Sequence, residues 1–193
     1  MTAAVLDPGL RITLRAALAL LFVWAAGHKL RDREAFRTTL ANYALVPQRW
    51  LRSVSMLLIG LELSVAAGLC IPAVTAAAAY AAAGLLAFYT GAIGINLIRG
   101  RRNIDCGCAG PLRRQPISAA LVLRNAVLAG AALACALPVS SRALTWVDGF
   151  TLVASATTLV LLYAAVDGLL VTAPHIRTMN RVGGHQPRVS SHA

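Results

Sequence analysis

Long runs of apolar residues, separated by short polar segments, fill most of this chain. Five of these runs reach the length of about 20 residues that a helix needs to cross the hydrocarbon core of a bilayer. They cover approximately residues 10–30, 51–71, 73–98, 116–137 and 147–172. The pattern predicts an all-α fold, a polytopic membrane helix bundle that forms one domain over residues 1–172.

A shorter amphipathic segment over residues 32–45 follows the first apolar run. Phe36, Leu40 and Tyr43 recur there at spacings of four and three residues. This spacing predicts a short helix on the membrane surface, with ordinary packing against the bundle as the alternative role for its aromatic face. Residues 173–193 are polar and basic, which predicts a disordered tail.

The composition agrees with a membrane protein. Hydrophobic residues make up 58% of the chain and charged residues only 13%, with a mean hydropathy of +0.69. The net charge of +11 does not indicate nucleic-acid binding, because the basic residues fall mainly between the apolar runs. Basic residues at such positions set the topology and meet anionic lipid headgroups. We therefore expect the lipid bilayer as a partner, and no nucleic acid.

The distribution of Lys and Arg predicts the orientation in the membrane. Six basic residues lie within 29–52, five within 99–114 and three in the tail, against at most three on the opposite side. Because cytoplasmic loops are enriched in Lys and Arg, the N-terminus is predicted outside and the C-terminus in the cytoplasm. A four-helix count with the N-terminus inside would instead place residues 99–114 outside.

Four polar residues inside the predicted helices are candidates for a buried site. They are Glu62 in the second run, Asn96 near the end of the third, and Arg124 and Asn125 in the fourth. An ionisable group at such a depth is costly and needs a partner, so we predict an ion pair between Glu62 and Arg124. This pair either specifies helix packing or, with the two Asn residues, shapes a cavity near the cysteines and tunes their thiolate.

Cys106 and Cys108 are the residues best suited to chemistry. A disulfide needs Cα atoms within about 4.4–6.8 Å, whereas residues i and i+2 of an extended chain lie about 6.6–7.2 Å apart. The chain must therefore turn, which Gly107 permits. A ring this small is expected to be strained, and strained, exposed disulfides tend to be catalytic or regulatory. Nearby arginines favour the reactive thiolate, whereas Asp105 opposes them.

Less specific interpretations of the cysteines stay open. Cys106 and Cys108 are alternatively plain loop residues or lipidation sites. Structural zinc needs four ligands, and two thiolates with Asp105 fall short, so no metal site is predicted. Cys70 and Cys135 fall near the opposite membrane face, either as a second pair or as small buried helix residues.

The segment Asp105-Cys106-Gly107-Cys108-Ala109-Gly110 resembles the Asp-Cys-Gly-Cys-Phe-Gly signature of the methylamine utilisation protein MauE family, whose wider relatives are DoxX-like membrane proteins. Further matching features are Gly27-His28-Lys29-Leu30, Phe36, Tyr43, Pro47, Glu62 and Arg124-Asn125. The resemblance covers roughly residues 10–137 and implies a four-helix core, to which the fifth helix is added. Ala109 stands where the family has phenylalanine, so packing beside the cysteines is expected to differ.

The resemblance implies a protein of the bacterial inner membrane that makes or maintains disulfides in a partner protein. The family is associated with maturation of methylamine dehydrogenase, whose small subunit is disulfide-rich and periplasmic, and a thioredoxin-like protein often accompanies such proteins. Cys106 and Cys108 would cycle between dithiol and disulfide as a thiol–disulfide oxidoreductase, supported by Asp105, Gly107, Lys29 and the four intramembrane polar residues. A quinone is a candidate electron carrier, since a core of about 30 Å separates the two cysteine pairs.

Two other function classes stay open. We call the loop that carries Cys106 and Cys108 the cysteine loop. A non-catalytic assembly factor or scaffold would use the cysteine loop to dock a partner or to share a metal. A small-molecule transporter is less well supported, because the apolar runs show no inverted repeat and contain one mid-membrane carboxylate. The family role points to the periplasm, whereas the distribution of charge places the cysteine loop in the cytoplasm.

Overall fold

The computed structural model of the 193-residue chain describes residues 6–106, 116–140 and 146–183. Its elements are the α-helices α1 (Pro8–Arg31), α2 (Arg33–Asn42), α3 (Leu51–Cys70), α4 (Thr75–Ile98), α5 (Ala119–Ala134) and α6 (Trp146–Gly183), with the short 3₁₀ helices η1 (Gln48–Trp50) and η2 (Pro72–Val74). The predicted all-α fold is therefore confirmed.

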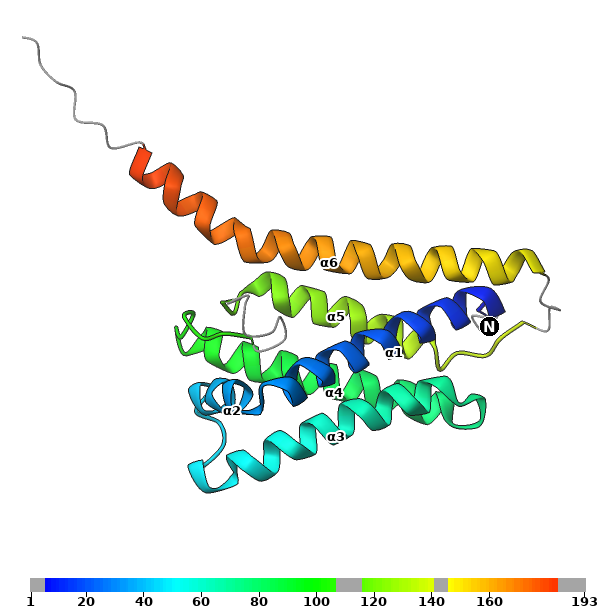
Figure 1. Ribbon diagram of the computed structural model, residues 1–193, viewed down its shortest axis with the longest axis horizontal. Coiled ribbons are helices and arrows are strands. Elements are labelled where there is room, and N and C mark those ends of the chain that lie inside the picture. The colour runs from blue at the N-terminus through cyan, green and yellow to red at the C-terminus, as the bar shows by residue number, and fades with distance from the viewer. Residues whose placement is uncertain (1–5, 107–115, 141–145, 184–193) are drawn as a thin grey trace, which may run out of the picture.

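Helices α1, α3, α4 and α5 run alongside one another as a bundle, and α6 lies along one side, in contact with α1 (Figure 1). Helix α2 and η1 lie at one end, together with residues 99–106 that lead into the cysteine loop. We call this the cysteine end. The start of α1, η2 and residues 135–140 lie at the other end, which we call the opposite end.

Within the described residues, four segments are long and apolar enough to cross a membrane. They are Pro8–Arg31, Gln48–Cys70, Pro72–Ile98 and Gly149–Val166. Helix α5 has 16 residues and is about 24 Å long, so residues on either side must complete a crossing of about 30 Å. The lengths and composition support the predicted membrane bundle.

Small residues let α3 and α4 approach closely. Ala78, Ala79, Ala82 and Ala83 of α4 are all buried in the main core. A Cβ added at Gly68 of α3 would lie only 2.9 Å from the Cβ of Ala78, closer than real Cβ contacts. Such close contact is a common means of helix association in membranes, where the hydrophobic effect between helices is weak.

The end of the last helix differs from the sequence-based expectation. Helix α6 continues to Gly183, past its predicted end at residue 172, so residues 173–183 are helical rather than disordered. A polar composition predicts exposure to water but does not by itself end a helix. Residues 184–193 lie outside the described residues. Helix α2 is confirmed, and Phe36 and Leu40 pack against the main core, as the packing alternative predicts.

Candidate functional site

Cys106 packs into a small hydrophobic cluster at the cysteine end, distinct from the main core of the bundle. The members of this cysteine cluster come from α4, α5, the end of α2 and both sides of the cysteine loop: Tyr43, Ile93, Ile104, Cys106, Ile117 and Leu121. Cys106 itself is only 9% exposed. The first cysteine of the motif is therefore held against a packed surface.

The two sides of the cysteine loop pair with each other through the backbone. The N–H of Ile117 donates to the carbonyl oxygen of Ile104 at 3.0 Å, and Asp105 and Pro116 form an isolated antiparallel bridge. The two ends of the cysteine loop therefore lie next to each other. The predicted site residues Gly107 and Cys108 lie outside the described residues.

Asn96, near the end of α4, is fully buried, and its side-chain amide both donates and accepts hydrogen bonds. Its Nδ2 donates to the carbonyl oxygens of Tyr43, at 3.2 Å, and Ala92, at 3.1 Å. Its Oδ1 accepts a hydrogen bond from Nη1 of Arg101 at 3.3 Å, and the backbone N–H of Arg101 donates to the carbonyl oxygen of Asn96 at 3.0 Å. We call Asn96, Tyr43, Ala92 and Arg101 the amide node. It ties the end of α2 and the start of the cysteine loop to α4.

The chain makes a strained turn beside the amide node. Ala44, which follows Tyr43, has a φ of 51°, in the left-handed region that costs a residue with a Cβ about 1–2 kcal/mol. Nη1 of Arg101 also lies 3.5 Å from the Tyr43 carbonyl oxygen. The hydrogen bonds of the node therefore hold a conformation that the backbone alone disfavours.

A second polar group lies deeper in the bundle, where Lys29 of α1 forms a buried ion pair with Glu62 of α3. Lys29 is 4% exposed and Glu62 is 1% exposed. The hydroxyl of Tyr89 on α4 donates to Oε1 of Glu62 at 2.8 Å and accepts from Nζ of Lys29 at 3.2 Å. Nζ of Lys29 also lies 5.0 Å from the ring centroid of Phe36 on α2. We call these four residues the ion-pair site, and it joins α1, α2, α3 and α4.

Glu62 has a buried partner, as predicted, but the predicted identity of that partner is wrong. The ion pair is with Lys29, whereas Cζ of Arg124 lies 5.4 Å from the ring centroid of Tyr163 on α6. Arg124 and Glu62 both lie inside apolar helices, but neither position alone tells which helix face each side chain occupies. Arg124 faces the added helix, and Lys29 supplies the charge inside the bundle.

Helical spacing is the sequence signal that identifies the inner residues. Lys29 follows the buried Ala26 by three residues, which places both on one face of α1. Tyr89, which the sequence analysis missed, precedes the buried Ile93 by four residues and is on the same face of α4. A basic residue at the end of an apolar run is easily assigned to the following loop, although its spacing places it inside.

The carboxylate of Glu62 has capacity for one more hydrogen bond. Its Oε1 meets Lys29 and Tyr89, whereas its Oε2 is buried and has no hydrogen-bond partner among the described residues. A buried ion pair is weak support for stability, since desolvation offsets the attraction. Ionisable groups within membrane helices more often accompany function.

The remaining predicted residues lie near the cysteine cluster. Asn125 is buried on α5, four residues after Leu121 of that cluster. Asp105 is half-buried and directly precedes Cys106. The structure thus brings Asp105, Cys106 and Asn96 together at the cysteine end, with Asn125 one turn away along α5.

At the opposite end, the interpretation of Cys70 and Cys135 as a second disulfide is wrong. Cys70 is exposed, Cys135 is fully buried, and both of these described residues are unpaired. The same end is stabilised by Arg15, whose Nε donates to the carbonyl oxygen of Leu69 at 2.8 Å. This bond satisfies a carbonyl in the last turn of α3.

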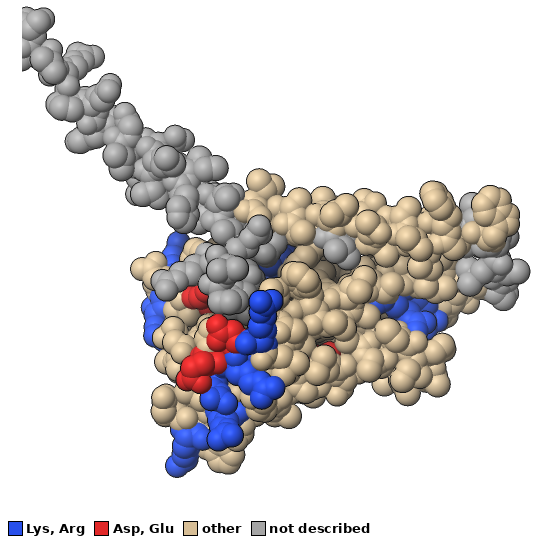
Figure 2. All heavy atoms as spheres, in the orientation of Figure 1, with Lys and Arg blue, Asp and Glu red and all other residues tan. Residues whose placement is uncertain are grey.

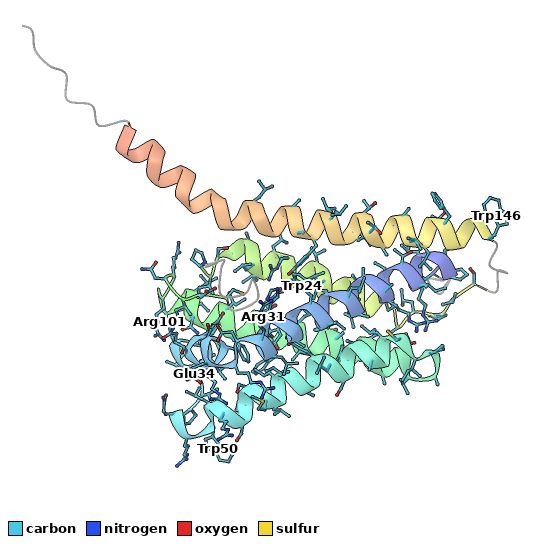
Figure 3. All side chains as sticks on the ribbon, viewed as in Figure 1. Trp24, Arg31, Glu34, Trp50, Arg101 and Trp146 are labelled. Atoms are coloured by element: carbon cyan, nitrogen blue, oxygen red, sulfur yellow. The ribbon has the colours of Figure 1, made fainter. Side chains whose placement is uncertain are left out.

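Charged side chains gather at the cysteine end (Figure 2). In Figure 3, Arg31, Glu34 and Arg101 lie at this end, whereas Trp146 lies at the opposite end. Within the parts of the chain that the structure describes, no three His, Cys, Asp or Glu side chains are grouped so that they could hold a metal ion.

Comparison with known proteins identifies the family. Residues 8–138 match the sequence model of the family described as methylamine utilisation protein MauE. The chain belongs to the MauE family. It is 40% identical to the methylamine utilization protein MauE of Paracoccus denitrificans, over 84% of this chain and 88% of that protein. It is 36% identical to the protein of that name from Methylophilus methylotrophus, over 90% of this chain and 92% of the relative. No solved structure matches the chain.

The family match covers both polar groups and the helices of the bundle, but not α6. It ends at residue 138, so it spans α1 to α5 and stops before α6. The amide node, the ion-pair site and Cys106 all lie within the matched region. This MauE-family chain is therefore a multi-pass membrane protein whose candidate site belongs to the part that it shares with the family.

Proposed function

We propose that this MauE-family protein supports thiol–disulfide exchange or electron transfer through Cys106 and Cys108, for disulfide formation and maturation of a partner protein. The observation that carries the proposal is the placement of Cys106 in the cysteine cluster, at the base of a loop whose two sides are paired. A buried, fixed cysteine with a second cysteine two residues away has its reaction partner at high effective concentration.

In the proposed reaction, a disulfide between Cys106 and Cys108 oxidises two thiols of the partner. A partner thiolate attacks one sulfur of this disulfide to give a mixed disulfide, which the second partner thiol resolves. The partner leaves with a disulfide, and Cys106 and Cys108 are left as two thiols, so electrons and protons balance. A quinone in the bilayer or a thioredoxin-like disulfide protein then accepts two electrons and two protons and restores the disulfide.

The charge around the loop supports thiolate chemistry. Arg99, Arg101 and Arg102 are exposed immediately before Cys106, and positive charge favours the thiolate over the thiol. Asp105 opposes this effect, as its place in the sequence predicts. The relatives' name concerns methylamine utilisation, so we place the partner protein of this chain in that process.

For location we propose the bacterial inner membrane, with the N-terminus outside and the C-terminus in the cytoplasm. Lys29 is buried in the ion-pair site, which leaves five basic residues between residues 31 and 52 to interact with headgroups or water. Together with the five between 99 and 114, they still favour a cytoplasmic cysteine end.

A membrane-impermeant maleimide should label Cys106 and Cys108 only after permeabilisation. Labelling of intact cells after reduction would place the loop outside.

The test of the exchange reaction uses the full chain in membrane vesicles. The oxidised protein is mixed with a reduced peptide that contains two cysteines, and the loss of peptide thiols is measured. Wild type should form one peptide disulfide per chain, and Cys106→Ser should form none. Cys70→Ser makes the same chemical change at an exposed cysteine of the opposite end and should retain full exchange.

The same variants separate exchange from scaffolding. Methylamine-dependent growth should fail in cells that carry only Cys106→Ser/Cys108→Ser. If this double variant supports growth as well as wild type does, the protein acts as a non-catalytic assembly factor. Equal peptide oxidation by wild type and Cys106→Ser would contradict the thiol reaction itself.

A further inference from the structure

We infer that Asn96 is a positioning residue for Cys106 and acts on it through Tyr43. The inference rests on the proposed function for its catalytic consequence. Asn96 is not a member of the cysteine cluster, but Tyr43 belongs to both groups. The buried side chain of Tyr43 packs in the cluster that contains Cys106, and the backbone carbonyl of Tyr43 accepts a hydrogen bond from Asn96.

Asn96 also holds the chain segment that leads to Cys106. Both the backbone N–H and Nη1 of Arg101 donate to oxygen atoms of Asn96, at 3.0 and 3.3 Å. Arg101 lies five residues before Cys106 in the sequence. Asn96, through its side-chain amide and its own backbone carbonyl, therefore fixes a neighbour of Cys106 in space and its approach along the chain.

The chemistry of the node needs an amide. Asparagine offers two N–H donors and a carbonyl acceptor, and the donors meet two backbone carbonyls while the acceptor meets a guanidinium. Aspartate has the same shape and keeps the acceptor, but it has no donor for the carbonyl oxygens of Tyr43 and Ala92. Leucine has a similar size and offers neither donor nor acceptor. These two substitutions therefore separate the bond to Tyr43 from the bond to Arg101.

The strained turn makes Tyr43 sensitive to this bond. Ala44 adopts a left-handed conformation immediately after Tyr43, so the backbone gains by relaxing once the carbonyl is released. Relaxation would withdraw the Tyr43 side chain from the cysteine cluster. Cys106 would then be more accessible and less firmly placed for exchange with Cys108.

The experiment measures the rate at which each cysteine is alkylated. The reduced full-length protein in its native membranes is pulsed with N-ethylmaleimide and digested with trypsin. Cleavage after Arg102 and Arg113 gives a peptide with both loop cysteines, which fragmentation assigns individually. Asn96→Asp and Asn96→Leu should each raise the Cys106 rate about fivefold, the change in local opening expected when the hydrogen bond to the Tyr43 carbonyl is lost.

Two controls distinguish positioning from general loosening. Cys135 is fully buried at the opposite end of the same molecule, so its rate should stay at the wild-type value. Thr75 is fully buried on α4 and makes a hydrogen bond to Ile71, so Thr75→Val removes one local bond far from the cluster. This variant should leave the Cys106 rate unchanged. Asn96→Gln, which keeps the amide, should label more slowly than Asn96→Asp.

The outcomes decide between the alternatives. If the Cys106 rate is unchanged in both Asn96 variants, or rises together with that of Cys135, Asn96 does not position Cys106. If an Asn96 variant does not accumulate in the membrane, Arg101→Gln removes one side of the node, and a rise confined to Cys106 supports the inference. An unchanged Cys106 rate in that variant counts against it.

Alkylation requires no partner protein, so this test does not depend on the exchange reaction. In the peptide assay, Asn96→Asp should lower the exchange rate, whereas Thr75→Val should not. Faster alkylation of Cys106 together with full exchange by Cys106→Ser would leave the positioning intact and contradict only the proposed function.

Discussion

Lys29 and Glu62 meet as full charges in the ion-pair site, whereas Asn96 meets backbone carbonyls and one guanidinium in the amide node. The first group joins the side chains of four helices deep in the bundle. The second joins backbone segments at its cysteine end. A charge stripped of its partner in an apolar surrounding costs several kcal/mol, whereas a lost neutral hydrogen bond costs about 1–3 kcal/mol. The comparison indicates that the fold depends on keeping the two charges of the ion-pair site together, whereas the amide node mainly places the cysteine loop.

Removing one charge of the ion pair should give the largest loss of stability. Glu62→Leu leaves the Lys29 ammonium buried without a counter-charge, which is expected to lower the free energy of unfolding by about 3–5 kcal/mol. Denaturant titration of the protein in mixed micelles measures this change. The double variant Lys29→Met/Glu62→Leu should recover most of the loss. A double variant as unstable as the single one would mean that the two charges do not act as a pair.

Asn96→Leu should give the second largest loss of stability. It should also give the largest change in the alkylation rate of Cys106. Two buried carbonyls, of Tyr43 and Ala92, lose a donor, which is expected to lower the free energy of unfolding by about 1–3 kcal/mol. The same titration measures the loss, and alkylation measures Cys106. The comparison fails if Glu62→Leu accelerates alkylation of Cys106 as much as Asn96→Leu does.

Tyr89→Phe tests the hydroxyl that lies between the charges. The ring and its packing stay, but one donor to Glu62 and one acceptor for Lys29 are lost. We expect the free energy of unfolding to fall by about 1–2 kcal/mol, with Cys106 alkylation unchanged. Tyr80→Phe removes a hydroxyl from an exposed residue of the same helix and should have no measurable effect.

Phe36→Leu should give the smallest change. Leucine keeps apolar contact with the main core but loses the aromatic face near the Lys29 ammonium, which is expected to cost about 0.5–1 kcal/mol. A loss of several kcal/mol would show instead that the aromatic ring anchors α2 by its volume. Phe36→Trp keeps an aromatic face and is the matched control. Its free energy of unfolding is compared with that of Phe36→Leu.

The sequence predicted the first two long helices closely because apolar length is a property of each segment alone. The first long helix, expected at residues 10–30, is Pro8–Arg31, and the second, expected at 51–71, is Leu51–Cys70. The partner of Glu62 was beyond the reach of the same reasoning. Choosing between Lys29 and Arg124 requires the rotation of three helices about their axes, which depends on packing between them.

The amide node was even less accessible from sequence. Asn96 could be selected as a polar residue in an apolar helix, but its main partners are backbone carbonyls, which every residue carries. No residue type therefore marks Tyr43 as one end of this bond. The left-handed conformation of Ala44 carries no sequence signal either, since glycine or asparagine is the usual residue at such a position. The roles of Gly107 and Cys108 stay predictions, because both lie outside the described residues.

Because the acceptor at residue 43 is a backbone carbonyl, the amide node tolerates substitutions at position 43 better than substitutions at position 96. A substitution at position 43 changes the side chain in the cysteine cluster but leaves the acceptor for Asn96 in place. A substitution at position 96 by a residue without an amide removes the donor itself, and no exchange at position 43 can restore it. Over many generations, residue 43 is thus free to adapt its volume to its neighbours, whereas any adjustment at residue 96 must keep an amide.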